Sequence, residues 1–153
     1  MIGSFDEPLE IDLYLREGAT SARPRQDALR ARLDRLASTP LVSAYRTHTW
    51  PARVSTDGDP ERIDRIEEWE AWAEHRGVSL APAFERHEAG SLVSEAGYEE
   101  IVLPVVWTDV TAGDDRLVAP HVDDGPVTVP QFVTALEARD GLGEAGSVAR
   151  TVA

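Results

Sequence analysis

The sequence predicts a single α+β domain, with about three helices packed on one face of a mixed or antiparallel sheet of about four to five strands. Two observations lead to this fold class. The 153 residues are enough for one hydrophobic core. Apolar residues recur with a period of two in some stretches and at helical spacing in others, and in chain order these stretches give β-α-β-α-(β)-β-β-α.

The first expected elements are a strand, a helix and a second strand. Residues 1–9 have the composition of a flexible leader. Apolar and polar side chains then alternate over residues 11–15, as in a half-buried strand. Leucines at helical spacing predict a helix over about 23–38. The β-branched and aromatic residues of 41–54 predict a strand that bends or ends near Pro51.

The middle of the chain predicts an amphipathic helix and a short strand. The helix is expected to begin at Pro60, with Asp59 as its N-cap, and to run to about Arg76. Gly77 is expected to end it. A weak strand is expected within residues 80–88.

The last part of the domain predicts a hairpin and a helix. The nearly unbroken apolar run of residues 100–110 predicts a central strand, irregular at Pro104, that pairs with a strand over 116–122. A capping-box pattern then starts a helix over 129–138. The predicted domain therefore spans residues 10–140 and is followed by a disordered tail, 141–153.

The composition indicates a cytoplasmic protein of a salt-rich cell. The net charge is −13, from 28 acidic residues and 15 basic residues that are all arginine. An acidic surface without lysine is expected where molar salt screens the repulsion, so the sequence predicts a halophilic, haloarchaeal protein. No apolar run approaches the roughly 20 residues that span a bilayer, and we expect no membrane partner.

Several kinds of chemistry are excluded. The chain has no cysteine, which removes disulfides, thiolate nucleophiles and cysteine-ligated zinc. It has no lysine for a phosphate-binding GxxxxGK loop, no GxGxxG, and no serine in a GxSxG context. We therefore expect no cofactor.

Positive charge is concentrated in one segment. Residues 20–54 hold seven arginines and two aspartates, a net charge of +5, so the remainder carries −18. Three interpretations stay open: a solvated helix face, a contact with an acidic protein partner, or a contact with nucleic-acid phosphates. The candidate contact residues are Arg25, Arg30, Arg32 and Arg35.

Two further sets of residues suggest binding. Trp72 lies at the edge of the apolar stripe of its predicted helix, where an exposed tryptophan can mark a partner surface such as a homodimer contact. His121, Asp123 and Asp124 lie together after a predicted strand, and with His87 they offer a candidate metal site.

One stretch carries a family resemblance. It is the run Trp69-Glu-Ala-Trp-Ala-Glu-His-Arg-Gly-Val-Ser-Leu-Ala-Pro-Ala-Phe84, supported by the strand of 11–15, the helix of 25–35, Leu103-Pro-Val-Val106 and the helix of 128–136. Over residues 10–138 the chain resembles a family of small acidic haloarchaeal proteins described as helix-turn-helix-like domain proteins and otherwise uncharacterised. The resemblance implies a transcription-related role and transfers no catalytic residue.

These observations favour a non-enzymatic binding or regulatory module, associated with transcription and acting through DNA or a protein partner. Two alternatives stay open. One is a small metal-dependent enzyme that uses the histidine and aspartate cluster, and the other is a structural homo-oligomer.

Overall fold

A computed structural model describes residues 7–89 and 98–145. Its elements, in chain order, are β1 (Leu9–Arg16), the 3-10 helix η2 (Thr20–Ala22), α1 (Arg23–Ala37), β2 (Val42–Trp50), β3 (Arg53–Ser55), α2 (Pro60–Arg76), β4 (Arg86–Ala89), β5 (Tyr98–Val102), β6 (Val106–Ala112), β7 (Asp115–Ala119), β8 (His121–Val122), β9 (Pro126–Val127) and α3 (Val129–Ala145). None of the described helices is long and apolar enough to cross a membrane.

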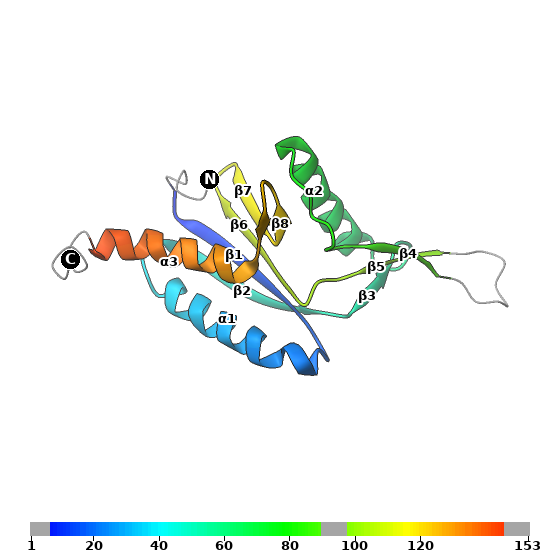
Figure 1. Ribbon diagram of the computed structural model, residues 1–153, viewed down its shortest axis with the longest axis horizontal. Coiled ribbons are helices and arrows are strands. Elements are labelled where there is room, and N and C mark those ends of the chain that lie inside the picture. Colours follow the sequence, from blue (N-terminus) through cyan, green and yellow to red (C-terminus); the bar gives the residue numbers. More distant parts are fainter. Residues whose placement is uncertain (1–6, 90–97, 146–153) are drawn as a thin grey trace.

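The centre of the fold is a mixed sheet with the strand order β2-β1-β6-β7. β1 and β2 run parallel, and α1 connects them, while β6 is antiparallel to both β1 and β7. The α+β class predicted from the sequence is therefore confirmed. Figure 1 shows α1 and α3 on one side of this sheet and α2 on the other.

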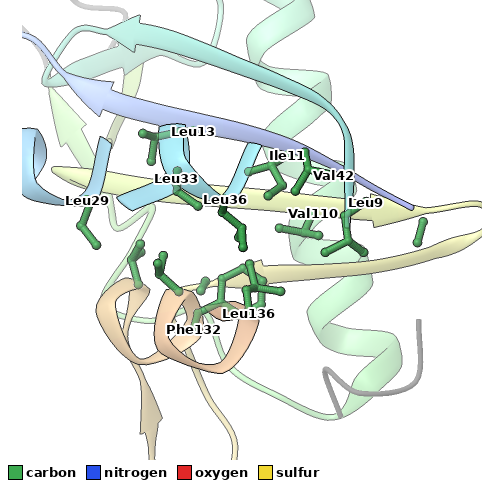
Figure 2. Packing of buried hydrophobic residues seen from close by; sticks show 14 of the residues in the cluster. Leu9, Ile11, Leu13, Leu29, Leu33, Leu36, Val42, Val110, Phe132 and Leu136 are labelled. Carbon is green, nitrogen blue, oxygen red and sulfur yellow. The ribbon is translucent and has the colours of Figure 1, made fainter. Parts of the chain in front are cut away.

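The larger core lies between the sheet and the pair α1 and α3. Alternate residues of β1 point into it, and they meet leucines of α1 and the apolar face of α3 (Figure 2). Leu13, Leu33 and Leu136 are fully buried here. Full burial of one such side chain stabilises the fold by about 1.5–3 kcal/mol, so this core fixes the position of α1.

The second core lies on the opposite face, under α2. Ile66 and Trp69 of α2 pack against Trp50, Trp107 and their neighbours. The expectation that all helices cover one face is therefore wrong. The reason is Trp107 of β6, whose side chain lies on the sheet face opposite that of Val106. Because Trp107 is large and apolar, a helix has to pack against this second face as well.

Local signals set the ends of α2 as predicted. The Asp59 carboxylate accepts a hydrogen bond from the backbone N–H of Arg62 at 3.2 Å. Gly77 ends the helix in the left-handed conformation, with φ of 71°. Glycine adopts this conformation without the steric cost that a Cβ atom brings.

Prolines divide three of the expected strands. Pro51 separates β2 from β3, Pro104 lies between β5 and β6, and Pro120 lies between β7 and β8. Proline cannot donate a ladder hydrogen bond, so the single strands expected over 100–110 and 116–122 each become two. The outer pieces form two small sheets, β3-β5-β4 and β8-β9, and Figure 1 shows the first projecting away from α1 and α3.

Two elements extend beyond residues 10–140, the predicted limits of the domain. Leu9 is fully buried in β1, so the ordered chain starts inside the expected leader, because the alternation that defines the strand extends to it. α3 continues to Ala145, so residues 141–145 are helical where a disordered tail was expected. Residues 1–6 and 146–153 lie outside the described residues.

Candidate nucleic-acid interface

The candidate arginines occupy two sides of α1. Each helical residue is rotated by about 100° from the one before it, so Arg25, Arg32 and Arg35 fall towards one flank of the buried stripe. Arg30 falls towards the other flank. Arg32 contacts α3, which identifies the first flank as the α3 side. The four residues therefore do not form one continuous face.

Arg32 is bound within the chain. Its Nη2 lies 2.5 Å from Glu137 Oε1, its Nε donates to Glu137 Oε2 at 3.1 Å, and its Nη2 also donates to Thr134 at 2.9 Å. This fork joins α1 to α3 across 105 positions of sequence. The hydrogen bond from Arg32 lowers the pKa of the Glu137 carboxyl. The guanidinium of Arg32 is thus engaged in holding two helices together.

The other α1 arginines are exposed and unpaired. The guanidinium groups of Arg23, Arg25, Arg30 and Arg35 have no hydrogen bond, ion pair or ring contact among the described residues. Four-residue spacing places Asp27 next to Arg23 and Asp34 next to Arg30 on the helix, but neither pair lies within ion-pair distance. Longer-range effects remain: Arg35 contributes to the lowered pKa of Glu137.

The remaining arginines of the described chain are mostly paired. Seven have a carboxylate within 4 Å: Arg32, Arg46, Arg53, Arg62, Arg65, Arg86 and Arg116. Arg16 donates to the Leu103 carbonyl, and Arg76 lies 5.7 Å from the centroid of the Trp72 ring. The unpaired guanidinium groups in the described chain are therefore all on α1, although acids outnumber arginines almost two to one.

Trp72 is half-buried and already has partners. Its Nε1 donates to the Arg116 carbonyl at 2.8 Å, and its ring meets His121 edge-on at 5.8 Å. It belongs to α2, on the sheet face opposite α1. A single flat partner surface would therefore not include both Trp72 and the α1 arginines, and a partner contact by Trp72 stays a prediction.

The structure does not assemble the candidate metal site. His121 is buried, and its Nδ1 donates to the Val118 carbonyl at 2.7 Å. Asp123 and Asp124 are exposed, and His87 lies 3.9 Å from Glu85. Within the part of the chain that the structure describes, no three histidine or carboxylate side chains gather closely enough to hold a metal ion. His121 instead completes a turn, because its ring bonds to the strand just before it.

The sequence reasoning missed a charged cluster on the α2 side of the sheet. Asp12 of β1 accepts from Arg46 Nε at 2.8 Å, and its Oδ1 also lies 2.8 Å from His48 Nε2. Burial opposes the charge of Asp12, but the hydrogen bonds from Arg46 and His48 hold its pKa below the usual value. Asp12 therefore has two basic side chains as hydrogen-bond partners.

Asp109 of β6 lies directly opposite Asp12 in the strand register. Its Oδ2 accepts from Trp69 Nε1 at 3.0 Å, and its Oδ1 is 3.1 Å from Arg116 Nε, an ion pair that is not aligned as a hydrogen bond. Burial raises the pKa of Asp109 despite these contacts. An acid inside the apolar run of 100–110 was the available signal for this second, partly polar sheet face.

Comparison with known families identifies the family of this chain. The family model described as a helix-turn-helix domain matches residues 4–141. The chain belongs to this helix-turn-helix domain family. No curated protein and no solved structure matches the chain.

The helices of this family member are not arranged as the family description suggests. A helix-turn-helix motif needs two helices joined by a turn of three or four residues. Here β2 and β3 separate α1 from α2, and strands β4 to β9 separate α2 from α3. The described residues therefore contain no such pair of helices. Among the described elements, α1 is the one that carries exposed arginines without a partner.

Proposed function

We propose that this protein is a non-enzymatic, DNA-binding regulatory module that contacts phosphates through α1, and that it works in the cytosol of a halophilic, haloarchaeal cell. The family assignment supports a nucleic-acid-binding role in general terms. The observation that carries the proposal is that the unpaired guanidinium groups of residues 7–89 and 98–145 all lie on α1, in a chain with a net charge of −13.

The charges of the helices favour α1 over α2 as the contact helix. α1 carries five arginines and two aspartates, a net charge of +3. α2 carries six acids and three arginines, a net charge of −3, and Arg62 and Arg65 are paired with acids. DNA phosphates would be repelled by α2 and attracted by α1.

High salt limits what α1 can achieve through phosphates alone. At 1 M salt the Debye length is about 3 Å, so attraction acts only at direct contact, and the repulsion from the acidic remainder is equally short-ranged. Phosphate contacts then position the protein, and sequence-specific binding would need base contacts as well.

The test is the binding of a fluorescently labelled random-sequence duplex, measured by anisotropy in about 0.5 M KCl. We expect the triple variant R25S/R30S/R35S to bind about ten-fold or more weakly than the unaltered protein. The matched control is R53S/R62S/R65S, which removes the same charge from positions away from α1 whose guanidinium groups are paired with carboxylates.

Circular dichroism of both variants confirms that each is folded. Equal losses in the two variants would show that only net charge matters. Undiminished binding by the α1 variant would contradict the proposal.

A further inference from the structure

A groove on the described surface lies on the α2 side of the sheet. It is formed by the C-terminal half of α2 and by residues 78–85, and its volume is about 600 Å³. This volume is within the range of about 300–1,000 Å³ that is typical of small-molecule sites. The groove shares no residue with α1.

The floor of the groove is apolar and preformed. Ala73, Leu80 and Phe84 line it and are more than nine-tenths buried. The Phe84 ring packs against Trp69, with ring centroids 5.6 Å apart. The 78–85 segment is tied down at both ends, because Ser79 and Val122 exchange backbone hydrogen bonds and the carbonyl of residue 85 accepts from the N–H of residue 102. A ligand would not have to order this segment.

The rim of the groove is acidic. Glu70, Glu74 and Glu85 line it. Glu70 is paired with Arg86 at 2.6 Å, whereas Glu74 and Glu85 have no arginine within ion-pair distance among the described residues. The Glu85 carboxylate lies 3.9 Å from His87 Nε2. An occupant therefore meets apolar carbon below and uncompensated negative charge at the edge.

We propose that this groove binds a small hydrophobic organic cation, whose apolar body covers Leu80 and Phe84 and whose charge lies at Glu74 and Glu85. An anion of the same shape would be repelled by the rim, and a hydrophilic cation would gain nothing from the floor. This site is separate from the proposed DNA contact, and either can fail without the other.

The experiment uses two ions of the same shape and opposite charge, tetraphenylphosphonium and tetraphenylborate. Titration calorimetry is carried out on the full chain in NaCl, because potassium precipitates the borate, at the lowest salt that keeps the protein folded. We expect one phosphonium site per chain, accompanied by a change in tryptophan fluorescence because Trp69 lies behind Phe84. We expect no binding of the borate.

Two sets of variants locate the site. E74Q and E85Q should each weaken phosphonium binding by about two- to five-fold, the effect of one exposed ion pair. E67Q, on α2 outside the groove, is the control for general attraction to an acidic protein and should change nothing. Equal binding of both ions, no binding of either, or equal effects of E67Q and E74Q would each overturn the proposal.

Discussion

The salt dependence of DNA binding gives the sharpest test of α1 as a phosphate-contacting helix. The logarithm of the affinity falls linearly with the logarithm of the salt concentration, with a slope of about −0.9 for each phosphate neutralised. Arg25, Arg30 and Arg35 are exposed and unpaired, so each is free to neutralise one phosphate. Replacing all three by serine should therefore reduce the size of the slope by about 2.7.

This difference is large enough to measure in the salt range that an acidic protein needs. Each doubling of the KCl concentration should weaken the unaltered protein about six-fold more than R25S/R30S/R35S, because two raised to the power 2.7 is about 6.5. The assay is an anisotropy titration of one labelled duplex at several concentrations between about 0.5 and 2 M KCl. Repulsion from the acidic remainder affects both proteins alike and cancels in the comparison.

Two outcomes would refute the reasoning. Parallel lines for the two proteins would show that the three arginines neutralise no phosphate, even if the variant binds more weakly. A slope change in R53S/R62S/R65S as large as that in the α1 variant would show that the effect follows net charge and not position. In either case the α1 arginines would be a solvated helix face.

Three further predictions concern stability. Arg32→Ala removes the forked contact with Glu137. Because the pair is partly buried, the loss should cost about 1 kcal/mol, which lowers Tm by about 2–4 °C, whereas Arg25→Ala should leave Tm unchanged. An equal loss in both variants by differential scanning calorimetry would contradict the assignment of Arg32 as the helix brace. The folded-state pKa of Asp12 is lowered, so its contacts stabilise the fold above the unfolded pKa of about 3.9 and lose this effect as the pH falls through the folded value. Asp12→Asn should therefore lower Tm at neutral pH and flatten its fall in acid, and a Tm–pH curve with unchanged shape would count against this ion pair. Transfer from molar KCl to dilute buffer should lower Tm or unfold the protein, because the excess acids are then unscreened, and an unchanged Tm would rule out a halophilic adaptation.

Features that depend on neighbouring residues were predictable from the sequence. The cap at Asp59 and the stop at Gly77 each involve atoms within a few positions, and both ends of α2 lie where expected. The alternation in β1 likewise predicts a strand with one apolar face. The alternation does not show which element packs against the other face of the sheet. That packing depends on Trp107 and on α2.

The candidate site shows the same division between local and distant information. Composition alone located the arginine-rich segment, and helical spacing placed five of its seven arginines on α1. Whether a given arginine is free depends on the rest of the fold. Arg32 is held by Glu137, 105 positions away in the sequence, and no pattern near Arg32 distinguishes it from Arg25. The buried pair of Asp109 and Trp69 arises in the same way, from two elements that meet only in the fold.

The brace at Arg32 also bears on the proposed function. α1 is attached to the sheet by leucines on its buried stripe and to α3 by the Arg32–Glu137 contact on its flank. Two attachments in different directions fix both the position of a helix and its rotation about its own axis. The free guanidinium groups of Arg25, Arg30 and Arg35 are therefore presented from a rigid element, which lowers the entropy cost of matching them to phosphates. On this view Arg32 is used for the ion pair with Glu137, and this contact holds the neighbouring arginines in place for a ligand.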